Sequence, residues 1–359
     1  MLKSDESMKQ LEARAIEAVR DVLHRVPIQL WSIDRPDLGD NDAIDFLADL
    51  SIDGKQHLLA CQVKSQGQPR HVRAAIFELI SATRRLQLPA TPVFIAPYLS
   101  PEVQALCIQH DVGFVDLVGN ARLVFEKVYI ERQVGTKPAA VQRGLKSIFK
   151  PKSAQVLRVL LRDPDRPWRV ADLAGSADVS LGHVSNVRGE LVDREWAEVT
   201  DDGLRLSRPD ALLDAWRDVY EPPAGERISF YTTLHGQAFD ASARAALNAD
   251  QNRAHAVLAS FSAAHWLAPY GRVSTHYFYA DTAGLAALSN SLKLSPAASG
   301  ANVVVVVLKE RGLLYDTAEP ASGVVCTSPV QTYLDLSAAG ERGAEAAEHL
   351  RKELLSWHK

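Results

Sequence analysis

Residues 151–208 constrain the fold most strongly, because three helical patterns there are followed by a tight turn. The segment PKSAQVLRVLLRDP predicts an amphipathic helix that stops before Pro164, and RVADLAGSAD predicts a short second helix. Ser180 is a natural N-cap for the third, LGHVSNVRGELVDREW. The segment AEVTDDGLRLS then predicts two short strands around an Asp-Gly turn. The expected unit is therefore three helices followed by a hairpin.

The third helical segment has one apolar face and one polar face. Four apolar residues repeat at helical spacing and are expected to face the core: Leu181, Val184, Val187 and Leu191. The opposite face carries small or hydrogen-bonding side chains: His183, Ser185, Asn186 and Arg188. The order of helix, helix-turn-helix and hairpin resembles the winged helix-turn-helix family.

That resemblance implies that the third helix enters the major groove of double-stranded DNA and reads base edges. Asn186 suits adenine, and Arg188 suits guanine. The DNA contacts expected from this region are Lys152, Arg169, Ser180, His183, Ser185, Asn186, Arg188 and Arg205. Residues 137–169 hold nine basic residues against two acids, which suits phosphate contacts. The alternatives are a solvated linker and helix face, or a winged helix that binds protein.

Residues 1–135 alternate between helical and strand patterns. Residues 8–25 and 70–86 predict helices, and TPVFIAPYL predicts a short buried strand. The segment AIDFLADLSIDGKQHLLACQV predicts a hairpin that turns at Asp53–Gly54. Ser100 is placed to cap the helix PEVQALCIQH, and GFVDLVGNARLVFEKVYIE adds further strands. This order is typical of an α/β layer domain.

Polar residues on that hairpin form a second candidate site. Asp45 and Asp49 lie on its first strand, while Gln62 and Lys64 share one face of the second. The arrangement resembles the restriction-endonuclease-like superfamily, which places Asp on one strand and Glu-x-Lys on the next. The resemblance implies Asp45, Gln62 and Lys64 as catalytic residues, with Asp45 and Asp49 as Mg²⁺ ligands.

Gln62 departs from the usual pattern, because Glu is the common residue at its position. A Gln-x-Lys form occurs in the Mrr-like branch of the superfamily, yet a neutral amide binds a hard cation more weakly than a carboxylate does. We therefore expect a degenerate nuclease-like domain. The plain alternative is that Lys64 is only the exposed end of a core strand. The basic residues Arg70 and Arg73 that follow suit a DNA backbone in either case, and a solvated helix face is the equal alternative.

Three segments spread along the chain resemble a single family. They are QVKSQGQPRHVRAA, GFVDLVGNARL and SPVQTYLDLSAAGERGAEAAEHL. All three are similar to the AbiEi antitoxins of type IV toxin–antitoxin systems, in their longer form. This resemblance implies DNA binding, repression of the protein's own operon, and a nucleotidyltransferase-like toxin as companion. The usual antitoxin of this type carries its winged helix at the N-terminus, whereas here the pattern is central.

The expected organisation is α/β (α+β) and multidomain. It comprises a restriction-endonuclease-like domain at residues 1–135, a basic linker at 136–150, a winged helix-turn-helix at 151–220 and a C-terminal AbiEi-like α/β domain at 221–359. The last contains ANVVVVVLKE, a run typical of a strand buried on both faces. Four residues in the same domain fit no metal motif and are expected to be core or interface residues: His265, Trp266, Tyr270 and His276.

Composition narrows the functional classes. The net charge is −4, so any nucleic-acid surface must be local. No apolar run approaches the roughly 20 residues that span a membrane. The three cysteines are scattered and fit no zinc spacing, so a reduced, cytoplasmic protein without a membrane partner is expected.

Three functions remain open from the sequence. The first is a sequence-specific DNA-binding transcriptional regulator with a degenerate nuclease-like domain, which needs no cofactor. The second is a Mg²⁺-dependent DNA endonuclease of a defence system, targeted by its winged helix. The third is a scaffold that neutralises a toxin. A palindromic operator would favour a homodimer, but no residue pattern decides the oligomeric state.

Overall fold

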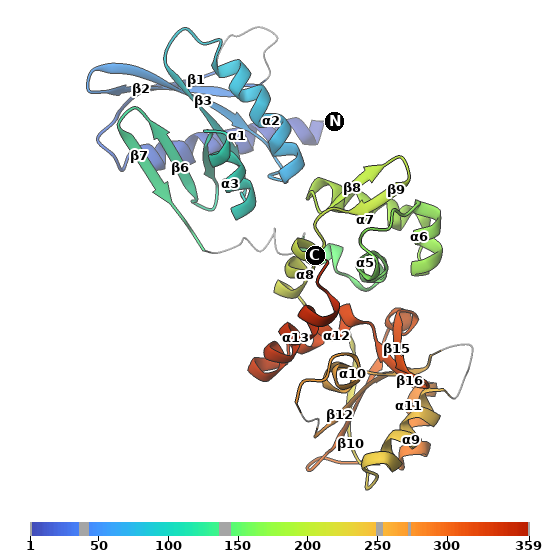
Figure 1. Ribbon diagram of the computed structural model, residues 1–359. Coiled ribbons are helices and arrows are strands. Elements are labelled where there is room, and N and C mark those ends of the chain that lie inside the picture. The colour runs from blue at the N-terminus through green and yellow to red at the C-terminus, as the bar shows by residue number, and fades with distance from the viewer. Residues whose placement is uncertain (1, 36–42, 136–144, 249–253, 272–273, 358–359) are drawn as a thin grey trace. The chain divides into compact units, whose positions relative to one another are not determined.

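The computed structural model describes residues 2–35, 43–135, 145–248, 254–271 and 274–357. The chain divides into two compact units, one built mainly from Met1–Arg143 and one mainly from Gly144–Val192 and Trp196–Lys359. Both mix helices with sheet, which confirms the α/β class at that level (Figure 1). The boundaries expected at residues 135, 150 and 220 stay predictions. Residues 136–144 of the expected linker lie outside the described residues.

The first unit is built on a seven-stranded sheet whose strands follow the chain order. The strands are β1 (Gln29–Asp34), β2 (Phe46–Ile52), β3 (Lys55–Val63), β4 (Ala90–Ala96), β5 (Gly113–Asp116), β6 (Ala121–Phe125) and β7 (Val128–Arg132). The pairs β3–β4 and β4–β5 are parallel, and the other pairs are antiparallel. Asp53 and Gly54 both have positive φ, 49° and 78°, so the predicted Asp-Gly hairpin turn is confirmed.

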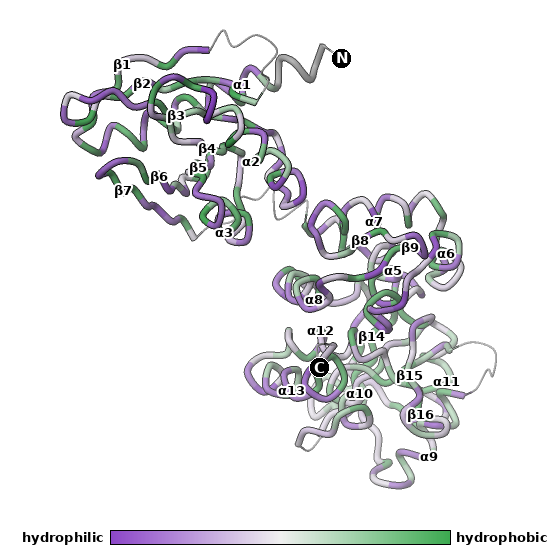
Figure 2. The backbone as a smooth tube through the Cα atoms, turned by 45° about the horizontal axis from the view of Figure 1, so that its top comes forward, coloured by the Kyte–Doolittle hydropathy of each residue, from purple (hydrophilic) through white to green (hydrophobic). Residues whose placement is uncertain are grey.

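Helices cover both faces of this sheet. α1 (Leu2–Leu23) packs Ala15 and Val19 into a cluster with Phe46 and Cys61 on one face. α2 (Pro69–Thr83) and α3 (Pro101–Gln109) pack on the other face, in a cluster that includes Phe94. Because successive strand residues point to opposite faces, each inner strand supplies both layers, and Figure 2 shows β3 and β4 as largely hydrophobic.

The second unit begins with three helices and a hairpin. These elements are α5 (Pro151–Arg162), α6 (Val170–Ala177), α7 (Leu181–Asp193), β8 (Ala197–Thr200) and β9 (Gly203–Leu206), followed by α8 (Pro209–Asp218). Trp168 adds a bridge to the hairpin, because its N–H donates to the Leu204 carbonyl over 2.8 Å and its carbonyl accepts from Leu204 N over 2.9 Å. Gly203 has φ 140°, and a Cβ there would lie 2.4 Å from the Trp168 carbonyl oxygen, so the turn requires glycine.

A second seven-stranded sheet follows, in the order β13-β10-β14-β12-β11-β16-β15. Its strands are β10 (Gly225–Tyr231), β11 (Ala256–Leu258), β12 (His276–Ala280), β13 (Ser295–Pro296), β14 (Val303–Leu308), β15 (Thr317–Ala321) and β16 (Val324–Thr327). The valine run forms β14, between β10 and β12, as an inner strand. Val303 and Val305 are fully buried, whereas Val306 is only half-buried, so the expected burial on both faces holds for part of the strand.

The remaining helices of this unit are α9 (Gly236–Leu247), α10 (Ser260–Leu267), α11 (Thr282–Leu292), the 3₁₀ helix η1 (Arg311–Tyr315), α12 (Pro329–Ser337) and α13 (Gly340–Leu354). One hydrophobic core joins the three-helix segment to α12 and α13: Leu157 of α5 and Leu191 of α7 share a buried cluster with Leu334 and Leu350. Every residue from Ser153 to Leu161 in α5 is consequently buried. In the described part of the chain, no helix has both the length and the apolar character to cross a membrane.

Candidate nucleic-acid interface

The core-facing side of α7 orients the helix. Val184, Val187 and Leu191 are 1%, 3% and 0% exposed, which confirms three of the four predicted core positions. Leu181 is 56% exposed, so its prediction as a core residue was wrong. It is the first residue of the helix, where the chain has not yet reached the packed interior. The three buried residues fix which side of α7 remains available to a ligand.

The polar face of α7 lies opposite that core. Ser185 and Asn186 are exposed, and Arg188 is half-buried. No hydrogen bond or ion pair joins the Asn186 or Arg188 side chain to another residue in the described part of the chain. An Asn amide offers a donor and an acceptor side by side, and an Arg guanidinium offers paired donors, which match the major-groove edges of adenine and guanine. This face can therefore make base contacts.

An open groove lies at the N-terminus of α7. Lys152, Ser180 and His183 line it, together with the C-terminal end of α6. Ser180 Oγ accepts a hydrogen bond from His183 N over 3.3 Å, which confirms the predicted N-cap. The His183 ring reaches back to α5, where its Nε2 lies 3.1 Å from Ser153 Oγ. The exposed Lys152 ammonium and the N-terminal end of α7 both favour an anion such as phosphate.

The β8–β9 hairpin is less suited to phosphate. Arg205 is ion-paired with Glu198 on the neighbouring strand, so its charge is already partly compensated. The turn at the tip carries the exposed acids Asp201 and Asp202. Arg169, by contrast, is exposed at the N-cap position of α6. We therefore expect the acidic hairpin tip to repel DNA, whereas the N-terminus of α6, with Arg169, can approach it.

One arginine of the basic stretch is buried, and a second, which remains exposed, pairs with the same acid. Arg158 is 4% exposed, and its Nε lies 3.6 Å from Asp316 Oδ2. Its Nη1 donates to Gln331 Oε1 over 3.2 Å. Arg162, one helical turn later, is also ion-paired with Asp316. The expectation that the basic residues along α5 hold phosphates was therefore wrong for Arg158, because it serves a buried contact with the C-terminal segment.

The first unit brings the candidate nuclease residues together at one end of β2 and β3. Asp45 directly precedes β2, and its Oδ2 accepts a hydrogen bond from Val63 N over 2.6 Å. The backbone N–H of Asp45 donates to the Cys61 carbonyl, so Asp45 lies beside the end of β3. Lys64 follows β3 and is half-buried. Gln62 is 0% exposed, and neither its Oε1 nor its Nε2 has a hydrogen-bond partner among the described residues.

These residues do not fit a Mg²⁺ site as they stand. Mg²⁺ is held by one or more carboxylates in octahedral geometry and keeps several waters. The Gln62 amide is neutral and enclosed, and the Asp45 carboxylate is bonded to the backbone. Asp49 accepts a hydrogen bond from Gln56 Nε2 over 2.6 Å, farther along β2. Among the described residues, no group of three or more His, Cys, Asp or Glu side chains is placed to hold a metal ion.

The start of α2 adds a basic surface next to Lys64. Arg70 and Arg73 are exposed on the first turns of α2. Lys64, His71 and Glu78 line an open groove there. The predicted backbone-contact residues Arg70 and Arg73 thus lie on the helix that follows Lys64, but they do not line this groove.

A buried polar cluster in the second unit had no counterpart in the sequence reasoning. Asp335 of α12 accepts hydrogen bonds from Tyr220 over 2.5 Å, from Tyr279 over 2.9 Å and from Gln331 over 3.0 Å. Burial raises the pKa of Asp335 to about 6, although these hydrogen bonds lower it. The signal in the sequence is weak: SPVQTYLDLS alternates polar and apolar residues in a helix that tertiary contacts bury all round.

Comparison with known proteins finds a family similarity for one part of the chain. A search of curated proteins returned no match, and neither did a search of solved structures. A family model matches residues 205–356, which begin within β9 and include α8, the second sheet and α9–α13. Helices α5–α7 precede the matched range. Residues 205–356 are thus similar to the family described as transcriptional regulator, AbiEi antitoxin, type IV TA system.

Proposed function

We propose that this protein is a sequence-specific DNA-binding transcriptional regulator of the AbiEi antitoxin type, whose α5–α7 and β8–β9 act as a winged helix-turn-helix. The observation that carries the proposal is the polar face of α7. Asn186 and Arg188 lie opposite the buried Val184 and Val187, and no described residue engages their polar groups. Such a helix can enter a major groove without losing an internal contact.

Charge around α7 supports this role. Lys152 and Ser180 line the groove at the N-terminus of the helix, where phosphate contacts fix the register of a recognition helix. His183 lines the same groove, and Arg169 is exposed at the N-cap of α6. Because its tip carries the acids Asp201 and Asp202, the hairpin is not expected to enter the minor groove. In this proposal, residues of α5, of the start of α6 and of the N-terminus of α7 contact phosphates, and the polar face of α7 contacts bases.

The family match supplies the regulatory context. Residues 205–356 resemble antitoxin regulators of type IV systems, so we propose the protein's own promoter as the target and a nucleotidyltransferase-like toxin as the companion. The first unit is proposed to be a degenerate restriction-endonuclease-like domain. Its sheet brings Asp45 and Lys64 to one end of β3, but the enclosed Gln62 amide replaces the carboxylate that metal chemistry needs. Arg70 and Arg73 would then hold DNA without cutting it.

The test is a footprinting experiment on the DNA upstream of the protein's own gene, with Mg²⁺ present. The expected result is one protected window on uncut DNA. Asn186→Ala and Arg188→Ala should each weaken specific binding by about 1–3 kcal/mol and relax the base preference at one position. Asn290→Ala is the matched control, because Asn290 is also an exposed helical Asn, on α11. Equal binding of all sequences by the wild-type chain would refute the proposal.

The same reactions without DNase test the endonuclease alternative. Cuts that require Mg²⁺ and disappear in Lys64→Ala would establish an active nuclease and contradict the degenerate assignment. The degenerate assignment would be supported if the wild-type chain left the DNA intact and the Gln62→Glu variant cleaved it, because this substitution restores the missing carboxylate.

A further inference from the structure

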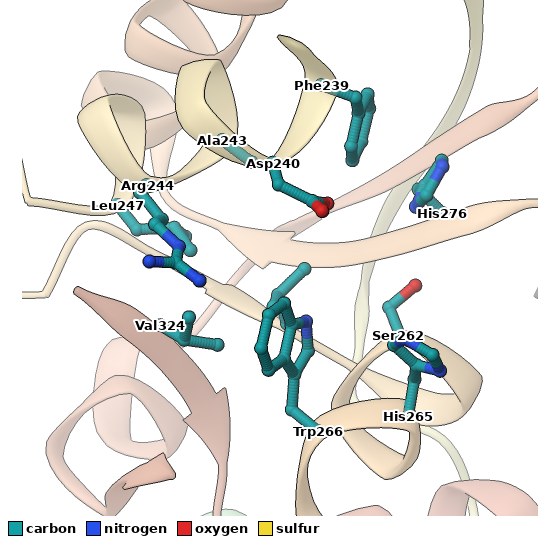
Figure 3. Close-up of a pocket in the computed structure, with 11 residues that line it drawn as sticks. Phe239, Asp240, Ala243, Arg244, Leu247, Ser262, His265, Trp266, His276 and Val324 are labelled. Atoms are coloured by element: carbon teal, nitrogen blue, oxygen red, sulfur yellow. The ribbon is translucent and has the colours of Figure 1, made fainter. Parts of the chain in front are cut away.

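The C-terminal part of the second unit contains a cavity of about 110 Å³. Asp240 and Arg244 reach it from α9, and Ser262 and Trp266 reach it from α10. His276, the first residue of β12, closes another side (Figure 3). The side chains come from segments far apart in sequence, so the tertiary structure alone assembles this set.

Two opposite charges face the cavity without pairing. Asp240 and Arg244 are four residues apart on α9, a spacing at which acid and base commonly form an ion pair. Within the described residues, no hydrogen bond or ion pair joins either side chain to a partner, and Arg244 Nε is buried without one. Figure 3 shows the Asp240 carboxylate directed toward the His276 side and the Arg244 guanidinium on the Val324 side. The cavity therefore has a negative end and a positive end.

Neutral polar groups lie between these ends. Ser262 Oγ accepts from Tyr277 N over 2.9 Å, which leaves its hydroxyl hydrogen to donate elsewhere. The Arg244 guanidinium lies over the Trp266 ring, 5.3 Å from its centroid, which holds the cation at one end. The His276 ring stacks on Phe239 with 3.7 Å between centroids, and burial lowers the His276 pKa, so the imidazole is neutral at pH 7.

The side chains around the cavity suit ligand binding and are not arranged for nucleophilic or metal catalysis. Among the described residues, no hydrogen bond connects Asp240, His276 and Ser262, so they do not form a nucleophile–base–acid chain. These side chains also form no metal-ligand group of three among the residues that the structure describes. What remains is a small enclosure with one carboxylate, one guanidinium and several hydrogen-bonding groups.

We infer that this cavity binds a small zwitterion, a free α-amino acid with a short side chain, whose ammonium group pairs with Asp240 and whose carboxylate pairs with Arg244. A cavity of about 150 Å³ accepts benzene, so this one suits about four or five non-hydrogen atoms, the size of the smallest amino acids. A partly enclosed charge is stabilised strongly by an opposite charge and is costly when left alone. A zwitterion compensates both ends at once, whereas a singly charged molecule leaves one end unpaired. The inference is independent of DNA binding.

The experiment is isothermal titration calorimetry of the full chain with glycine, L-alanine and L-serine. Two analogues serve as wild-type controls: L-alaninamide lacks the carboxylate, and propionate, which is no larger than L-alanine, lacks the ammonium group. At least one amino acid is expected to bind in the millimolar range or tighter, and each analogue at least about tenfold more weakly than L-alanine. Asp240→Asn and Arg244→Gln should each lower the affinity about tenfold or more. Glu353→Gln on α13, an exposed acid outside the cavity, should not change it.

Two results would overturn the inference. One is the absence of binding heat with all three amino acids up to about 10 mM, the range of very weak complexes. The other is equal binding of the amino acids and both analogues, which would show that the two charges do not select the ligand. The analogue series uses the wild-type chain and therefore decides the question even where a variant unfolds. Arg244→Lys, which keeps the positive charge, should retain more affinity than Arg244→Gln.

Discussion

Arg158 on α5 donates a hydrogen bond to Gln331 on α12 over 3.2 Å, and both side chains are buried. This contact joins the proposed DNA-binding helices to the segment that resembles AbiEi. Asp316 compensates the Arg158 charge, with Nε and Oδ2 3.6 Å apart. Because the Arg158 guanidinium is enclosed, the contact holds α5 against the C-terminal segment only while its acidic partner is in place.

Replacing Arg158 should therefore destabilise the second unit. We expect Arg158→Ala to lower the free energy of unfolding by about 3 kcal/mol, because it removes the buried one of the two arginines that pair with Asp316 and also removes the donor to Gln331. Arg162→Ala is the matched control on the same helix: Arg162 also pairs with Asp316 but its side chain is 59% exposed, so the loss should stay within about 1 kcal/mol. Urea denaturation measures both. Equal losses would contradict the assigned role of Arg158.

Asp335 should make stability depend on pH. Burial raises its pKa to about 6, above the usual value of 3.8 for an aspartate side chain. The folded state then binds the proton more tightly than the unfolded state does, so this contribution is complete below about pH 4 and is lost as pH rises to about 6. The loss is about 3 kcal/mol at most. Urea denaturation from pH 4.5 to 7.5 should show this slope in the wild type but not in Asp335→Asn. If the free energy of unfolding changed with pH in the same way in both proteins, the role of Asp335 would be refuted.

Asp116 should stabilise the turn after β5. It is buried, and its carboxylate accepts hydrogen bonds from the backbone N–H groups of Val118, Gly119 and Asn120 over 3.0, 2.9 and 2.8 Å. Asp116→Ala would leave the N–H groups of Val118 and Asn120 without this acceptor, at an expected cost of about 2 kcal/mol or more, whereas Gly119 N–H keeps its hydrogen bond to the Asp116 carbonyl. Asp34→Ala, an exposed acid in β1, should cost less than about 0.5 kcal/mol. Thermal unfolding compares the two variants, and a mild Asp116→Ala would count against the role.

The Gln62 amide should reduce stability. It is fully buried without a hydrogen-bond partner among the described residues, so Gln62→Met, which keeps the length and removes the polar group, should raise the free energy of unfolding by about 1–2 kcal/mol. Gln109→Met at an exposed position of α3 should be neutral. Chemical denaturation measures the free energy of unfolding of both variants and of the wild type. Destabilisation by Gln62→Met would show that the amide has partners after all.

Lys152 should contribute to DNA affinity through phosphate. Lys152→Ala is expected to weaken binding to all sequences alike and to reduce the slope of log affinity against log salt by about 1. Lys352→Ala, an exposed lysine of α13, is the control and should leave the slope unchanged. Fluorescence anisotropy over a range of salt concentrations measures it. A loss confined to the specific site would instead assign Lys152 to base recognition.

Patterns that depend on neighbouring residues could be predicted from the sequence. The Asp53–Gly54 turn, the N-caps at Ser100 and Ser180, and the spacing of Val184, Val187 and Leu191 all follow from local backbone geometry and helical period. The class of the fold followed from the order of those elements. The prediction that Leu181 is a core residue was wrong, because the burial of a residue at the end of a helix depends on which other segment packs against that end.

The burial and pairing of charged side chains came from the tertiary structure alone. Nothing near Arg158 in sequence indicates that Asp316 and Gln331 will compensate it, so a basic residue on a helix looked solvent-exposed. Asp240 and Arg244, which have no ion-pair partner among the described residues, likewise form a possible binding site only when α10 and β12 enclose them. Local sequence sets backbone conformation through interactions over a few residues, whereas the burial and pairing of a charge depend on segments that can be tens of residues away, as for Asp240, or more than a hundred, as for Arg158.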